Sequence, residues 1–399
     1  AQQEYEYMAG GDLEGSFQAK AGQRLVGVVF RKKVYEPEGI LEVFPRQMGR
    51  DIGNFKGGDP GIGTVTITGP YKPTGLGDTP SRSKIFTCNP AVNEEESCAR
   101  EILSRLARQA YRRPVTDDEV EALLGLYRTG RSEEGFEEGI RMALQGLLVS
   151  PGFLFRIEQD PPGLAAHTAY PVSDLELASR LSFFLWSSIP DEVLLELAEA
   201  GKLRDPEILK EQAQRMLADK RSDALVTNFA GQWLYLRNVS QRFPNNRIYP
   251  DFDEELRLAF ERETELFFDS MVREDRRLTD LLDADYTFVN QRLAEHYGIP
   301  DIFGSHFRRV TLADENRRGL LGQGSFLLVT SRNNRTAPVL RGKWVLENLL
   351  GTPPPPPPPD VPALNENREE VQKMTMRQRT EAHRVNPACA VCHVQMDPI

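Results

Sequence analysis

Apolar residues recur at helical spacing through the middle of the chain, from Cys98 to about residue 300. The first run has apolar side chains at positions i, i+1, i+4 and i+8, namely Ile102, Leu103, Leu106 and Ala110. Capping boxes that begin at Thr116 and Ser173 mark two helix starts. Further amphipathic runs cover 136–150, 191–200, 205–234, 253–274 and 286–297. The pattern predicts a central all-α helical domain over residues 88–300.

Residues 1–87 have a different pattern. Glycine-rich turns separate short runs rich in β-branched residues, such as 24–30 and 64–68. These alternations predict a β-sandwich-like module, which is expected to be incomplete because it opens on what resembles a strand. The predicted fold class is therefore mainly α with an N-terminal β module.

The last hundred residues divide into three predicted parts. Residues 301–352 are predicted to form a helical and loop subdomain, and 353–360 a polyproline linker. Residues 361–399 are predicted to form a cofactor-binding segment that is expected to be truncated. Seven consecutive prolines favour a stiff polyproline II rod. This rod either holds the last segment about 20 Å from the helical body or wraps it along that body. A ligand for a proline-binding module is the rival interpretation.

Charge and hydropathy exclude several classes of protein. The 399 residues contain 49 Lys and Arg against 59 Asp and Glu, a net charge of -10, which disfavours a nucleic acid partner. No apolar run approaches the roughly 18 residues of a membrane-spanning helix, so no transmembrane segment is expected. The chain opens without a basic and apolar leader, and any secretory signal is expected to be cleaved or to lie outside this sequence.

The sequence Cys389-Ala390-Val391-Cys392-His393 carries the most specific chemistry. Two thiols three positions apart can each form a thioether with one vinyl group of a porphyrin, and the imidazole that follows can ligate its iron. The pattern predicts one covalently bound haem c, with His393 as the proximal iron ligand. A zinc site or a plain dithiol are the alternatives, and the neighbouring sequence supplies neither further zinc ligands nor a βαβ pattern.

The sequence leaves the identity of the second axial ligand of the iron undecided. His383, ten residues before His393, is the best local candidate, and Met374 and Met376 come next. His296 could serve if the proline rod folds back, whereas Met396 is expected on the proximal side. A filled distal position favours electron transfer, and an open one favours a haem-dependent oxidative enzyme.

Cys88 and Cys98 enclose nine residues rich in Asn and Glu. Such a polar loop suits a disulfide, with two unrelated buried thiols as the alternative. Covalent haem attachment and a structural disulfide both belong to compartments outside the cytosol. We therefore expect a periplasmic, extracellular or cell-surface protein.

Several longer motifs resemble one family. The segments are 107–116, 177–191, 228–234, 285–290, 296–299, 341–344 and 386–398. They are similar to the planctomycete-type multidomain cytochrome c proteins, which are exported and built from adjacent domains of unknown function with a C-terminal haem motif. Members usually carry more sequence at both ends, so the resemblance implies a fragment of a longer protein. It implies haem and export but no substrate.

Three classes of function remain open. The first is an exported c-type cytochrome that exchanges electrons with a redox partner protein or with further haem domains. The second is a scaffold module that binds a polysaccharide or a partner, with Tyr5, Tyr7 and Tyr71 as candidates for stacking on sugar rings. The third is an enzyme, although no hydrolase motif occurs and no catalytic residue is assigned.

A group of basic residues lies just before the proline run. Its members are Arg332, Arg335, Arg341 and Lys343. These side chains either clamp haem propionates or another anion, or form a solvated basic face.

Overall fold

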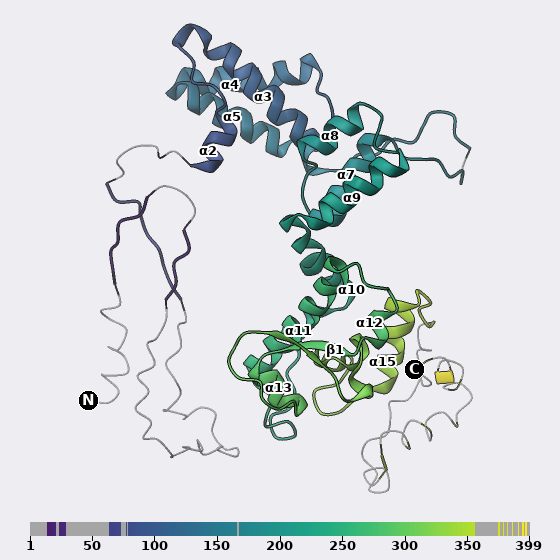
Figure 1. Cartoon of the computed structure of the whole chain (residues 1–399). Helices are drawn as coiled ribbons and strands as arrows, with labels where there is room; N and C mark the ends of the chain where they lie inside the picture. Colours follow the sequence, from purple (N-terminus) through teal and green to yellow (C-terminus); the bar gives the residue numbers. More distant parts are fainter. Residues whose placement is uncertain are drawn as a thin grey trace. The chain divides into compact units, whose positions relative to one another are not determined.

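The computed structural model describes residues 79–165 and 167–355. It also describes short stretches at 14–20, 24–28 and 64–72, residue 77, and positions 374, 375, 378, 381, 385, 390, 393, 394 and 396 near the C terminus. Two compact units are present (Figure 1): unit 1 contains 1–108 and 115–154, and unit 2 contains 109–114 and 155–399. Each unit is described separately below.

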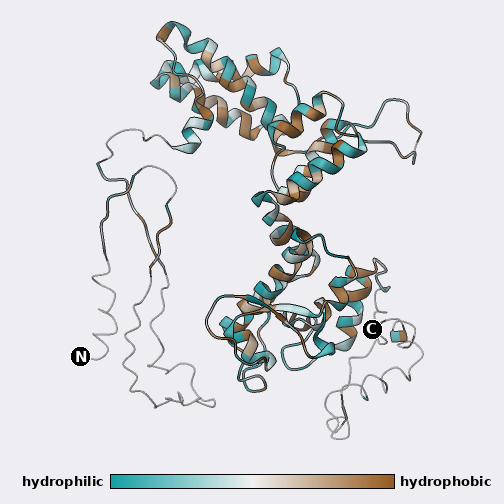
Figure 2. Cartoon of the chain, viewed as in Figure 1, coloured by the Kyte–Doolittle hydropathy of each residue, from teal (hydrophilic) through white to brown (hydrophobic). Residues whose placement is uncertain are grey.

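Helices build unit 1. In chain order they are α2 (Pro80–Ile85), the 3₁₀ turn η2 (Val92–Glu94), α3 (Glu95–Tyr111), α4 (Asp117–Glu134), α5 (Phe136–Val149) and α6 (Pro151–Leu154). Thr116 caps α4 through the capping box predicted from the sequence, with its side chain accepting from the Glu119 amide. Apolar and polar residues alternate around these helices (Figure 2), so each helix turns one stripe inward. Fully buried residues at the centre are Ile102, Leu103, Leu124, Tyr127 and Ile140.

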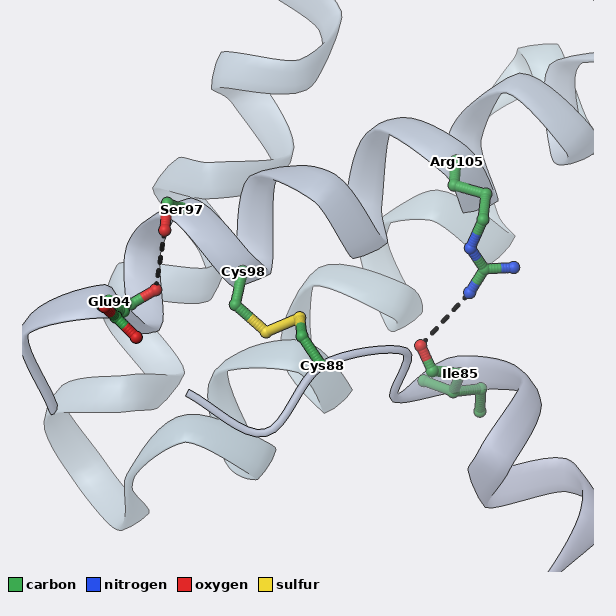
Figure 3. Close-up of a disulfide and its surroundings, with 6 residues drawn as sticks. All are labelled: Ile85, Cys88, Glu94, Ser97, Cys98 and Arg105. Atoms are coloured by element: carbon green, nitrogen blue, oxygen red, sulfur yellow. Dashed lines mark hydrogen bonds between the residues drawn. A yellow bond between two sulfur atoms is a disulfide. The ribbon is translucent and has the colours of Figure 1, made fainter. Parts of the chain in front are cut away.

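A disulfide joins the segment after α2 to α3. Cys88, on the segment after α2, bonds to Cys98 on α3, with the two Cα atoms 6.1 Å apart (Figure 3). Arg105, two turns along α3, donates to the carbonyl of Ile85 at 3.2 Å. The predicted disulfide is confirmed, and the arginine fixes the end of α2 beside the same helix.

Unit 2 is also mainly helical. Its first helices are α7 (Asp174–Trp186), α8 (Glu192–Glu199), α9 (Pro206–Ala218), the 3₁₀ turn η3 (Lys220–Ser222), the π-helix η4 (Leu225–Ala230), α10 (Gly231–Trp233) and the 3₁₀ helix η5 (Leu236–Gln241). Ser173 forms the second capping box, as predicted. The amphipathic run at 205–234 forms several helical pieces, because the backbone leaves the helix at Asp219 and resumes in 3₁₀ and π geometry.

The rest of unit 2 surrounds a small sheet. Its elements are α11 (Glu254–Arg273), α12 (Asp280–Asp283), β1 (Tyr286–Val289), α13 (Gln291–Tyr297), β2 (Arg308–Thr311), η6 (Glu315–Arg317), η7 (Leu320–Gly322), α14 (Gly324–Val329), α15 (Pro338–Trp344) and the π-helix η8 (Val345–Leu349). The strands pair antiparallel, with Tyr286 opposite Thr311 and Val289 opposite Arg308. The prediction of an all-α domain is wrong at 286–289, where alternating aromatic and β-branched residues form a strand.

The predicted N-terminal β-sandwich-like module is not supported. The described residues of 14–20, 24–28 and 64–70 form neither helix nor strand. Their apolar side chains are exposed, including Leu25, Val28 and Ile67. A β-patterned run needs a partner strand and a covered face to become a sheet, and these described stretches have neither.

The described helices include none that combines the length and apolar character required to cross a membrane.

Candidate functional site

The C-terminal segment contacts α15 of unit 2. The backbone of Met396 lies against Gly342, where an added Cβ would come within 2.0 Å of the Met396 carbonyl oxygen. Only glycine permits this approach. Met396 is itself buried, at 7% exposure. The contact favours a segment that returns to the helical body after the proline run rather than one held away from it.

The predicted haem residues fall on this segment. His393 is half-buried and helical, three residues before Met396. Cys389, Cys392, His383 and Met376 lie outside the described residues. Met374 is exposed. The structure thus brings the segment to α15 at Met396, three residues beyond His393.

His296 occupies a different environment on α13. Its ring lies 5.4 Å from the ring of Phe260, in an edge-on arrangement. Burial lowers the pKa of His296, and the positive charges of Arg317 and Arg292 lower it further. Of the proposed sugar-stacking tyrosines, Tyr71 is exposed and donates to Thr68 at 2.8 Å, whereas Tyr5 and Tyr7 lie outside the described residues.

The four basic residues before the proline run have separate surroundings. Arg332 and Arg335 face each other across a short antiparallel bridge. Lys343 pairs with Glu347 one turn on, with 3.4 Å between Nζ and Oε1. Arg341 is half-buried, and its guanidinium carbon lies 5.9 Å from the ring centroid of Phe326.

A pair of hydrogen bonds joins α10 to the π-helix η8, which follows α15. Trp233, which follows the π-helix η4, donates from Nε1 to the carbonyl of Asn348 in η8 at 2.6 Å. The Asn348 amide returns a hydrogen bond to the Trp233 carbonyl at 2.7 Å. These reciprocal bonds join two segments 115 residues apart, and π-helical turns occur frequently at functional sites. Sequence reasoning noted the segment 228–234 but neither Asn348 nor this contact.

A buried carboxyl group lies in a separate polar cluster of unit 2. Glu263 on α11 is 1% exposed. Its Oε1 accepts from the Thr287 hydroxyl and its Oε2 from the Tyr297 hydroxyl, both at 2.6 Å. The amide of Gly324 donates to the Tyr297 hydroxyl at 2.7 Å. One carboxyl group therefore connects α11, β1, α13 and α14.

Burial dominates the ionisation of this cluster. Loss of hydration raises the pKa of Glu263 to about 7, against the opposing effect of its two hydroxyl donors. Burial, followed by the neighbouring Glu263 charge, raises the pKa of Tyr297 well above 10. The Arg317 guanidinium lies 4.2 Å from the Tyr297 ring centroid and lowers the pKa of both groups.

Sequence reasoning missed Glu263, although a signal was present. Glu263 falls on the apolar stripe of the run 253–274, between Phe260 and Phe267. A carboxylate at such a position requires buried partners. Among the described residues, no group of three or more His, Cys, Asp and Glu side chains could hold a metal ion.

Three protein-family models match the chain in succession. Residues 98–158 match PSD5, a protein of unknown function (DUF1595), and residues 172–299 match PSD4, a protein of unknown function (DUF1592). Residues 317–399 match PSCyt3, a protein of unknown function (DUF1588). The three models matched belong to the planctomycete-type domain set. No curated protein and no solved structure matches it.

These matches confirm the resemblance at the level of the domain set. The PSCyt3 match has a cytochrome-like name and includes α15, the proline run and the segment with Cys389, Cys392 and His393. The contact between Gly342 and Met396 thus lies within the PSCyt3 region.

Proposed function

We propose that the chain is part of an exported c-type cytochrome that carries one haem and transfers electrons within a larger multidomain protein. Cys389 and Cys392 hold the porphyrin by thioether bonds, and His393 ligates the iron. The observation that carries this proposal is the Cys-x-x-Cys-His sequence inside the region that matches PSCyt3. When bound, the haem supplies a one-electron redox centre.

The described residues support a haem at this place. His393 is half-buried on the segment that contains the buried Met396. On α15, which this segment contacts, the half-buried Arg341 has a buried Nε without an acceptor among the described residues. An unpaired buried donor beside the segment suits a group that brings carboxylates.

Export follows from the chemistry of the cysteines. The disulfide between Cys88 and Cys98 supports an oxidising compartment, as does covalent haem attachment. The proposed location is therefore the periplasm or the cell surface. The redox partner is a separate protein or a further haem domain.

The coordination of the iron decides between electron transfer and a haem-dependent oxidative enzyme. We expect a low-spin ferric spectrum that does not change on addition of cyanide, because a side chain such as His383 fills the distal position. The visible spectrum of the purified haem-loaded protein, with and without cyanide, measures this. His383→Ala should convert the spectrum to high spin if His383 is the ligand.

The opposite outcome has a clear meaning. A high-spin spectrum that shifts with cyanide or peroxide in the unaltered protein would contradict electron transfer and favour the oxidative enzyme. A spectrum that stays low-spin in His383→Ala would still support electron transfer but would show that another residue is the distal ligand. Variants of Met374 and Met376 would then be tested next.

A further inference from the structure

Two surface loops of unit 2 carry the same three residues in the same order, Asn-Asn-Arg. They are 245–247, which lies between η5 and α11, and 333–335, which lies between α14 and α15. The backbone amide of Asn245 donates to the carbonyl of Asn333, with 2.8 Å between the two atoms. The fold therefore places the two loops side by side, although they are far apart in the sequence.

Each of these loops is also held by a hydrogen bond of its own. In the first loop, the side-chain Oδ1 of Asn245 accepts from the backbone amide of Arg247 at 2.9 Å. In the second loop, the Arg332 amide donates to the Arg335 carbonyl at 2.9 Å across a short antiparallel bridge. The side chains of both loops thus project from a fixed backbone, so less conformational entropy is lost when a ligand binds to them.

A hollow of about 490 Å³ lies where the two loops meet. This volume is within the range of about 300–1,000 Å³ that is usual for sites that bind small ligands. The lining contains aromatic, amide and guanidinium side chains but no carboxylate. The residues are Phe243, Pro244, Asn245, Asn246, Arg247 and Asn333.

Phe243 supplies an aromatic surface to the hollow. The residue is 63% exposed, and the guanidinium carbon of Arg257 lies over its ring, 4.9 Å from the ring centroid. Arg257 in turn pairs with Glu254 at 2.8 Å. The ring is therefore held by a cation on one side and exposed elsewhere. The C–H bonds of a sugar ring carry small positive partial charges, which the negative face of an aromatic ring attracts.

The polar side chains of the hollow are available to a ligand. Among the described residues, the side chains of Asn246, Arg247 and Asn333 have no hydrogen-bond or ion-pair partner. An asparagine amide both donates and accepts hydrogen bonds, as the hydroxyl groups of a sugar do. An arginine only donates, and it adds a positive charge. The hollow thus combines a stacking surface, amides for hydroxyl groups and a cation.

The positive charge of Arg247 is not neutralised within the part of the chain that the structure describes. Arg247 has no carboxylate within 4.0 Å there. Two acidic residues that follow the first loop have other partners: Asp253 pairs with Arg292 at 2.9 Å, and Glu254 pairs with Arg257. A guanidinium group can bind a carboxylate or a sulfate through two parallel N–H groups. The charge therefore favours an anionic ligand over a neutral one.

We propose that Phe243 and the two Asn-Asn-Arg loops form a binding site for an acidic polysaccharide. Phe243 stacks on one sugar ring, and Arg247 pairs with a carboxylate or sulfate group of the sugar. The amides of Asn246 and Asn333 exchange hydrogen bonds with its hydroxyl groups. The whole chain has a net charge of -10, which disfavours nonspecific attraction of a polyanion and so confines binding to this site. The site is independent of the proposed haem.

Biolayer interferometry of the full chain on three immobilised polysaccharides tests the proposal. Alginate presents carboxylates, dextran sulfate presents sulfates, and dextran is neutral. We expect binding to alginate or to dextran sulfate, which identifies the anionic group, and no binding to dextran. Phe243→Ala and Arg247→Gln should each weaken binding about tenfold, through loss of the stacking surface and of the charged donor respectively.

Two variants elsewhere in unit 2 are the matched controls. Phe303→Ala removes an aromatic ring that is 70% exposed, and Arg277→Gln removes an exposed arginine that has no ion pair among the described residues. Both controls should bind like the unaltered protein.

Four outcomes would overturn the proposal. They are no binding to either acidic polysaccharide, equal binding to dextran, equal loss of binding in the site variants and the controls, and binding that neither site variant weakens. A loss in only one of Phe243→Ala and Arg247→Gln would refute a site that uses both the ring and the charge.

Discussion

Replacing Glu263 by Leu is expected to destabilise unit 2 by about 2–6 kcal/mol. The substitution leaves the Thr287 and Tyr297 hydroxyls without their acceptor, and each unpaired buried donor costs about 1–3 kcal/mol. Glu263→Gln keeps the shape and one acceptor oxygen, so its cost at acidic pH should be much smaller. Denaturant unfolding followed by circular dichroism measures both variants.

The same residue predicts a pH dependence. The pKa of Glu263 is raised to about 7 in the folded protein, against 4.5 for its ordinary value. Between these values the folded state binds more protons at Glu263 than the unfolded state, so the stabilisation that Glu263 contributes is fully present below about pH 4.5 and is lost as pH rises towards 7. The fall contributed by one group is at most about 1.4 kcal/mol per pH unit.

Glu263→Gln should remove this contribution. The free energy of unfolding of the variant should therefore rise relative to that of the unaltered protein as pH increases from 4.5 to 7. Glu255→Gln, an exposed position on the same helix, is the matched control and should keep the original slope. A Glu263→Gln protein with the same pH profile as the control would contradict the assignment of a buried carboxyl group with a raised pKa.

Removing the disulfide is the second change with a large expected effect. Cys88 and Cys98 close a loop with a sequence separation of 10. Loss of the cross-link frees the unfolded chain, and a loop of this size corresponds to about 2.7 kcal/mol in the chain-entropy model. The double variant Cys88→Ser and Cys98→Ser should therefore shift the unfolding midpoint of unit 1 to a lower denaturant concentration.

The unaltered protein under reducing conditions provides the control, because it should lose a similar amount of stability without any substitution. Unfolding curves that coincide with and without the disulfide would contradict the prediction. Thiol alkylation before and after reduction, read by mass spectrometry, shows whether the bond is present in each sample.

The helices were predictable because their signals are local. The capping boxes at Thr116 and Ser173 and the apolar periodicity of 253–274 each depend on residues within a few turns, and the structure has helices there. The disulfide was also predictable, since its two cysteines enclose a short polar loop. The local pattern at 286–297 predicted only a helix, whereas this run contains both a strand and a helix.

Features that depend on distant contacts were not predictable. The strand β1 exists because 308–311 pairs with it, and the exposed runs at 24–28 and 64–68 show the same kind of β pattern without a partner among the described residues. The hydrogen bonds between Trp233 and Asn348 join segments 115 residues apart. Likewise, nothing near Gly342 in the sequence indicates that Met396 packs against it.

The predicted haem motif is the opposite case, because its signal is local. Cys389, Cys392 and His393 lie within five consecutive residues, so their predicted chemistry follows from spacing alone. What surrounds the motif depends on tertiary structure, and the described part of the chain shows the contact of Met396 with Gly342 on α15. The motif therefore predicts the cofactor, whereas its surroundings do not follow from the sequence.

The mass of the intact denatured protein tests the central claim most directly. The chain is expressed for export together with a cytochrome c maturation system and then denatured, which releases any haem that is not covalently bound. We expect the mass of the polypeptide plus one haem, and the bare polypeptide for a Cys389→Ser, Cys392→Ser double variant. A bare polypeptide mass for the unaltered protein under these conditions would contradict the account.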